Sequence, residues 1–155
     1  MEKFEQNLDD AMKSLEIADH MTYVTFPLIK EKRLLLKILT EIHDALLKTI
    51  NAILQYEYSF KRINLYKEAK DNFNTFKEIS QSYSINEEQI ARIVEIFRLM
   101  ERHKKSPFEF VKEDKIVIMS EGMRADTLSL EKIKFFLLEA KDVHRKAMNV
   151  IKRRI

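Results

Sequence analysis

The sequence has 155 residues, of which 45% are hydrophobic and 34% are charged, a composition typical of a globular domain rather than a disordered chain. It holds no cysteine, which excludes disulfides, thiolate metal sites, iron–sulfur clusters and cysteine nucleophiles. The net charge of +3 is uneven: residues 1–85 carry 12 basic against 13 acidic side chains, and residues 86–155 carry 16 against 12. The basic C-terminal half favours a polyanionic partner such as RNA, although solvated basic helix faces account for the same excess.

Turn-forming residues are almost missing from the chain. Gly occurs once, at Gly122, and Pro twice, at Pro27 and Pro107, so long helices are expected. Every apolar run is much shorter than the roughly 20 residues needed to cross a bilayer, and residues 1–30 lack the basic start and short apolar centre of a signal peptide. We therefore expect one soluble domain over residues 1–155, located in the cytoplasm and without a membrane partner.

Apolar residues spaced three and four apart predict the helices of the N-terminal half. One helix is expected over residues 2–22, ending near "TYVTFPL" because Pro27 disfavours a helical Phe26. The apolar bend that follows is expected to cover one end of the core. A second helix over residues 30–62, roughly 45 Å long, should form the spine of the fold, and a shorter one is expected over residues 66–81.

Two further helices are predicted in the C-terminal half. Ser84 and Glu87 stand at capping-box spacing before a helix expected over residues 86–104. Ser129 is the expected N-cap of a last helix over residues 130–153.

Between these two helices the pattern changes, because β-branched and aromatic residues follow Pro107. They predict an antiparallel hairpin of Lys115–Met119 with Arg124–Leu128, and Phe108–Val111 is a candidate third strand. The expected fold class is therefore all-α: an up-and-down bundle of about five helices with a small β-hairpin before the last helix.

The strong catalytic motifs are missing from this sequence. A single Gly rules out a glycine-rich phosphate loop, and there is no His-Glu-x-x-His. The four histidines, His20, His43, His103 and His144, fall on four different predicted helices, and all but His103 are explained as surface or hydrogen-bonded side chains. We expect no metal and no cofactor, and no convergent polar set predicts a small-molecule pocket.

The stretch "FRLMERHKKSPFEF", residues 97–110, is the exception, since it reads Arg98-x4-His103 at the end of a predicted helix. Here the chain resembles the HEPN superfamily, small helical bundles whose ribonuclease members carry an Arg-x(4–6)-His motif near the end of a late helix. The resemblance implies a metal-independent endoribonuclease site built across a homodimer. Arg98 would stabilise charge on the scissile phosphate, and His103 would act as general acid or base.

The spacing of this pair sets a geometric condition. Five residues advance about 500° on a helix, which leaves Arg98 and His103 about 140° apart. They converge only if the helix loosens before His103 or a second protomer supplies one of them. Leu99 departs from the polar residue common at that position in the nucleases. Further RNA-binding candidates are the remaining basic residues of this stretch and of the last helix: Arg102, Lys104, Lys105, Arg145 and Lys146.

The alternative hypothesis is a non-enzymatic helical adaptor or homo-oligomer with a protein partner. It would bury the surplus apolar flank of the long helix, or the aromatic group Tyr56, Tyr58 and Phe60. The segments "TYVTFPLIK", "HKKSP" and "EDKIVI" are also similar to small helical proteins of archaea, a resemblance that implies no activity.

Overall fold

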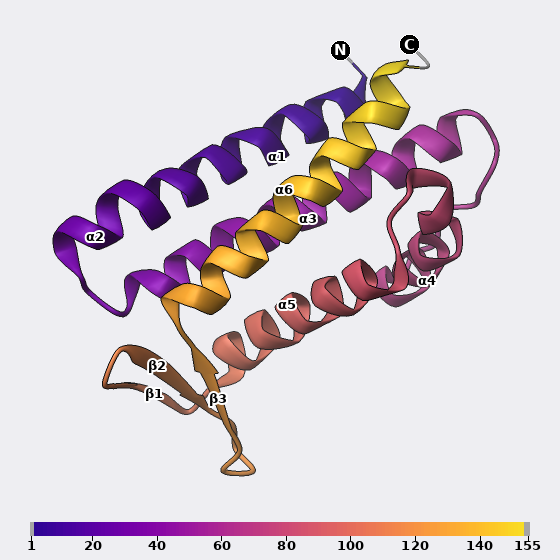
Figure 1. Ribbon diagram of the computed structural model, residues 1–155. Helices are drawn as coiled ribbons and strands as arrows, with labels where there is room; N and C mark the ends of the chain where they lie inside the picture. Colours follow the sequence, from indigo (N-terminus) through magenta and orange to yellow (C-terminus); the bar gives the residue numbers. More distant parts are fainter. Residues whose placement is uncertain (1, 154–155) are drawn as a thin grey trace.

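The computed structural model describes residues 2–153, and five helices make up most of it. Figure 1 shows four of them running along the molecule in alternating directions, with the shorter fifth at one end and a small sheet at the other. The predicted mainly helical fold is confirmed. No helix within residues 2–153 is long and apolar enough to cross a membrane. The helices are α1 (Lys3–His20), α3 (Leu34–Ser59), α4 (Ala69–Ile79), α5 (Glu87–Lys105) and α6 (Leu130–Arg153).

Helix α3 is the centre of the fold, and it packs against α1, α4, α5 and α6. Its 26 residues span about 39 Å. Fully buried side chains such as Leu35, Ile42 and Ile53 lie on its main apolar face, and Ala52 widens the buried surface. The expected spine is confirmed, with a later start, because Lys30 takes a left-handed backbone conformation and the chain turns before Leu34.

The segment after α1 differs from its prediction. Helical backbone continues through a π-helix, Met21–Thr25, and a short helix α2, Phe26–Ile29, so α1 does not give way to an irregular bend. Pro27 lies in the first turn of α2, directly after the π-helix, whose wider turn accommodates a residue without an N–H. Phe26 is buried, but Leu28 and its neighbour Ile29 are exposed. Only part of this segment therefore covers the core.

Helix α5 begins with a cap that the sequence analysis assigned to the wrong residue. The side chain of Asn86 accepts a hydrogen bond from the backbone N–H of Gln89 at 2.8 Å. Ser84 instead takes a left-handed conformation at the end of the 3₁₀ turn Ser80–Tyr83 that follows α4. At the start of α6, Ser129 is the N-cap as predicted, since its hydroxyl accepts from the N–H of Lys132 at 3.2 Å.

The segment between α5 and α6 forms a sheet of three antiparallel strands, where a hairpin was predicted. The strands are β1 (Phe108–Lys112), β2 (Lys115–Met119) and β3 (Ala125–Leu128), in the order β1-β2-β3. The predicted hairpin corresponds to β2 and β3, and the candidate third strand is β1. A third strand adds a ladder of backbone hydrogen bonds that a two-stranded hairpin lacks, which supports so small a sheet.

The two faces of this sheet have different environments. Ile116, Ile118 and Leu128 are fully buried and belong to the hydrophobic core, so this inner face packs on the helices. Because side chains alternate along a strand, Phe108 and Phe110 point to the opposite, outer face, where both rings are exposed. Figure 1 shows the sheet at the C-terminal end of α5.

Candidate functional site

The C-terminal end of α5 carries the predicted catalytic pair. The helix stays regular through Lys105 and ends at Ser106, which has an extended backbone, directly before Pro107. The predicted stop is therefore confirmed, but the helix does not loosen before His103. On a regular helix the Arg98 and His103 side chains point about 140° apart, and each contacts a different strand.

Two arginines of α5 share one carboxylate. Arg98 and Arg102 lie one helical turn apart on the same face, and each places Nη1 3.2 Å from an oxygen of Asp126 on β3. The Asp126 side chain is mostly buried, whereas Arg98 keeps nearly half of its side chain exposed. One negative charge thus partly neutralises two guanidinium groups and ties α5 to β3.

His103 binds a carboxylate on the other edge of the sheet. Its Nδ1 lies 2.6 Å from Oε2 of Glu109 on β1. Arg33, which precedes α3, donates to the backbone carbonyl of Glu109 at 3.3 Å. When Nδ1 carries the hydrogen, this bond fixes the orientation of the imidazole and leaves Nε2 as the basic nitrogen.

The two carboxylates occupy one cross-strand row. Glu109 pairs with Ile118 in the β1–β2 ladder, and Ile118 pairs with Asp126 in the β2–β3 ladder. Two strand spacings separate the outer members by roughly 10 Å. Arg98 and His103 therefore bind opposite ends of a row whose centre is a buried isoleucine, and within one chain they do not share a partner.

The lysines at the end of α5 are exposed on the helix surface, whereas its arginines bind the sheet. Lys105 pairs with Glu101 at 2.8 Å on the helix surface. The bond raises the pKa of Lys105 and lowers that of Glu101. Lys104 is exposed to solvent.

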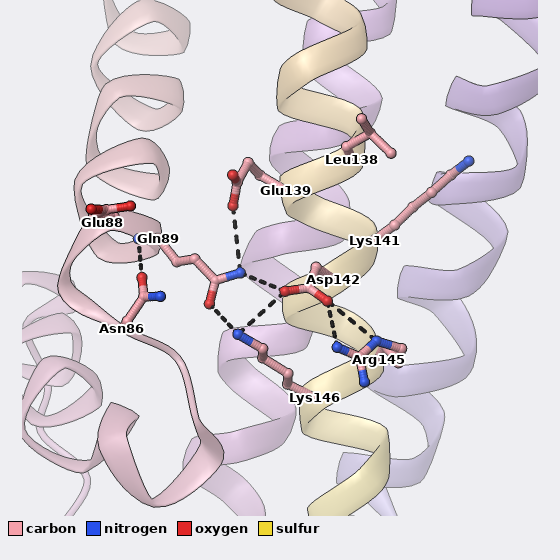
Figure 2. A pocket seen from close by; sticks show the side chains of 9 residues that line it. All are labelled: Asn86, Glu88, Gln89, Leu138, Glu139, Lys141, Asp142, Arg145 and Lys146. Atoms are coloured by element: carbon pink, nitrogen blue, oxygen red, sulfur yellow. Dashed lines mark hydrogen bonds and ion pairs between the residues drawn. The ribbon is translucent and has the colours of Figure 1, made fainter.

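The other predicted RNA-binding residues, Arg145 and Lys146, belong to α6 and lie beside the start of α5. Figure 2 shows them around Asp142, where Arg145 Nη2 and Lys146 Nζ approach the carboxylate at 2.5 and 3.3 Å. Gln89, near the start of α5, donates to Asp142 at 2.7 Å and accepts from Lys146 at 2.7 Å. Gln89 and Lys105 are sixteen residues apart, about 24 Å along the helix. The predicted basic residues thus form two groups, not one surface.

Asp142 is the centre of this second group. Burial raises its pKa, but hydrogen bonds from Arg145, Gln89 and Lys146 outweigh burial, so the pKa lies below its usual value. Asp142 offsets one of the two positive charges of the group, and Gln89 links Asp142 with Lys146, as Figure 2 shows. Arg145 and Lys146 are thus both bonded to Asp142, and their part in RNA binding stays a prediction.

The outer face of the sheet was missed by the sequence analysis. Phe108 and Phe110 lie side by side, with ring centroids 6.1 Å apart and planes 20° from parallel, and they are 48% and 38% exposed. Lys112 and Lys115 pair across the hairpin on this same face. The only acidic residues within the three strands, Glu109 and Asp126, point to the inner face. The alternation of aromatic and other residues in "FEFVK" was the available signal for a two-faced strand. Only the strand register shows that its phenylalanines lie on the outer face.

The remaining histidines do not join these sites. His43 lies 3.3 Å from Asp44 and packs edge-on against Phe97. His144 is buried between α6 and α1, with Nε2 3.0 Å from the carbonyl oxygen of Leu8. Among residues 2–153, no three His, Asp or Glu side chains are arranged to hold a metal ion.

The comparisons with known proteins add no family to this picture. No family model matches the sequence, and no curated protein matches it. The proposal for its function is therefore argued from the geometry of the chain itself.

Proposed function

We propose that this protein binds single-stranded RNA on the outer face of its β-sheet. The observation that carries the proposal is the pair of parallel, exposed rings of Phe108 and Phe110 on a strand face that holds two lysines and no carboxylate. Unpaired bases stack on aromatic side chains, and an antiparallel sheet is a frequent platform for such stacking.

The charges around the rings fit a polyanion. Lys112 and Lys115 lie next to the ring row, where their ammonium groups can contact phosphates of a strand whose bases stack on the phenylalanines. Both acidic side chains of the strands are held on the other face by α5. The acidic side chains of the strands are thus kept off the face proposed to meet RNA, and the exposed Glu113 and Asp114 lie beyond it, in the turn between the two lysines.

Binding without cleavage is the version that the geometry favours. Arg98 and His103 are bound to separate carboxylates about one sheet width apart. In a single chain the two side chains are thus held by different partners rather than around one common site. Their contacts fasten α5 to the sheet and so hold the RNA-binding face in place.

Fluorescence anisotropy with a labelled single-stranded RNA tests this proposal. Phe108→Thr and Phe110→Thr remove the ring and introduce a β-branched residue, which suits a strand. Each should weaken binding by about 5- to 150-fold, the range for loss of one base–aromatic contact. Double-stranded RNA should bind more weakly, since its bases are not free to stack.

One control and one further variant complete this experiment. Phe135→Ala removes an equally exposed ring on α6 and should leave affinity unchanged. Lys112→Ala should reduce the slope of log affinity against log salt by about 0.7, the value for one phosphate contact on a single strand. Unchanged affinity in both phenylalanine variants, or affinity indifferent to salt, contradicts the proposal.

Metal-independent RNA cleavage is a second candidate function, and one observation supports it. The bond between His103 and Glu109 resembles the carboxylate–imidazole pair that orients a general base. As the resemblance to the HEPN superfamily implies, a second protomer would have to supply the arginine. Incubation of RNA with the protein and a metal chelator tests this candidate. Cleavage that is lost in both Arg98→Ala and His103→Ala supports it, and intact RNA refutes it.

A further inference from the structure

A groove between α1 and α6 is an apolar surface feature that the proposed function does not use. It has a volume of about 700 Å³, and its apolar lining comes from Met12, Leu15, Val24 and Met148. Met12 and Val24 remain 41% and 45% exposed. The predicted homo-oligomer surface lies elsewhere, and its central member, Tyr56, is fully buried in the core. Tyr58 and Phe60 at the end of α3 stay 52% and 53% exposed, so apolar surface is also left open there, and the groove is distinguished by the opposite charges of its two walls.

The two walls of this groove carry opposite charges. Glu16 and Asp19 line the α1 side, and Lys141 and Arg145 line the α6 side. Lys141 forms an ion pair with Asp19 across the groove. An occupant that satisfies both walls must itself present a basic edge and an acidic edge, in mirrored order, on either side of an apolar strip.

We propose that this groove is a dimer interface and that its occupant is a second copy of the same chain. A two-fold axis lying along the groove places α1 of each copy opposite α6 of the other, at the same height. Asp19 of one copy then faces Lys141 of the other, and Glu16 lies within the same band of charge as Arg145. Met12 and Val24 of both copies are buried together on the axis.

The mirrored charges favour this occupant over a small ligand. A single anionic or cationic group in the groove would meet one wall of like charge, because the acidic and basic walls face each other. The methionines adapt their shape to an apolar surface, so they suit a partner with the same flexible side chains. The ion pairs set the register of the two copies, and burial of the apolar strip provides most of the association free energy.

Charge-reversed variants, mixed in solution, test the interface. Asp19→Lys places two lysines opposite each other across the interface, and Lys141→Asp places two carboxylates there. Each variant alone should be monomeric by sedimentation or light scattering where the native chain is a dimer. An equimolar mixture should restore the dimer as a heterodimer, because each reversed charge then faces an opposite one.

A matched control uses the exposed ion pair on α5. Glu101→Lys and Lys105→Glu reverse charges of the same kind outside the groove, and both should dimerise like the native chain. Circular dichroism on every variant checks that the helices are intact. A native chain that stays monomeric at about 1 mM, where even a weak dimer would be detected, overturns the proposal. So does a dimer that survives either groove reversal, or a mixture that remains monomeric.

Discussion

Glu109 and Asp126 lie on the same face of the sheet, at the two ends of one cross-strand row, and each binds a basic side chain of α5. Between them Ile118 is fully buried against the helices. The polar contacts therefore flank an apolar one, which limits the access of water to the junction. This arrangement gives Arg98, Arg102 and His103 partners within the chain, whereas Lys105 pairs on the helix surface and Lys104 is exposed.

The first prediction concerns Asp126, the shared partner of two arginines. Asp126→Asn keeps the size of the side chain but leaves Arg98 and Arg102 one turn apart without a carboxylate between them. We expect a loss of about 1 kcal/mol in the free energy of unfolding, which lowers the melting temperature by roughly 2–4 °C. Thermal unfolding followed by circular dichroism measures the change.

Glu101→Gln is the matched control for this variant, since it also removes a carboxylate paired with a basic residue of α5, but on an exposed surface. Its melting temperature should stay close to that of the native chain. Equal effects of the two substitutions would show that Asp126 does not fasten the helix to the sheet.

The fate of Arg98 and His103 shows what a sequence motif leaves open. The spacing correctly predicted that the two side chains diverge on a straight helix, and Pro107 correctly predicted where that helix ends. The partners of both side chains, however, come from strands 6 and 28 residues further along the chain. Which carboxylate faces which helix turn depends on how the sheet docks, and no local pattern encodes that.

The outer face of the sheet is a second feature that the sequence did not predict, although its strands are close together in the chain. The sequence predicted β2 and β3 and offered β1 as a candidate, so the strands themselves were within reach. Phe108 and Phe110 count as core residues by composition alone. Their exposure follows from the register, which turns Ile116 and Ile118 inward and leaves the phenylalanines outside.

The prediction for the segment around Pro27 was wrong for a different reason. A proline is usually a helix breaker because it lacks an N–H and crowds the preceding turn. Here the π-helix Met21–Thr25 widens the turn before the ring, and Phe26 can remain helical. Propensity rules treat each residue singly and do not foresee a change of helix type upstream.

A second prediction concerns the cap of α5. Asn86→Ala removes the acceptor for the Gln89 N–H and should cost about 1 kcal/mol of stability, the usual value for an N-cap. Ser84→Ala is the control, because the structure assigns the cap to Asn86. Chemical denaturation curves of the two variants compare them, and a larger loss from Ser84→Ala would contradict the assigned cap.

A third prediction concerns the buried carboxylate of Glu57. Arg62 donates two hydrogen bonds to Glu57 Oε2, at 3.1 and 2.6 Å, and the pKa of Arg62 is raised by this contact. Arg62→Met keeps the apolar stem but leaves the carboxylate without this partner. We expect a loss of about 2 kcal/mol, since a buried charged acceptor without its donor is costly. Urea denaturation gives the value.

The control for Arg62 has nearly the same exposure. Arg92 is 39% exposed against 41% for Arg62, and both guanidinium groups lie over aromatic rings, but its partner Glu95 is far more exposed than Glu57. Arg92→Met should therefore cost less than 1 kcal/mol. Similar losses in the two variants would mean that the burial of Glu57 does not matter.

The last prediction is a pH dependence of stability that originates at His144. Burial lowers the pKa of its imidazole below 6.5, against the smaller opposing effects of the Leu8 carbonyl and of Asp9. Above pH 6.5 the histidine is neutral in the folded and unfolded chain and contributes no difference. As the pH falls below that value, the unfolded chain takes up a proton that the folded chain refuses, so stability is lost with a slope of at most about 1.4 kcal/mol per pH unit.

His144→Gln isolates this contribution, because glutamine can still donate to the Leu8 carbonyl but cannot take up a proton. Urea denaturation at a series of pH values between 7.5 and 5 should give a flatter dependence for the variant than for the native chain. His20→Gln, which removes an exposed histidine at the edge of the same groove, is the matched substitution for comparison. If the His144 variant loses stability with falling pH as steeply as the native chain does, the proton uptake belongs to another residue.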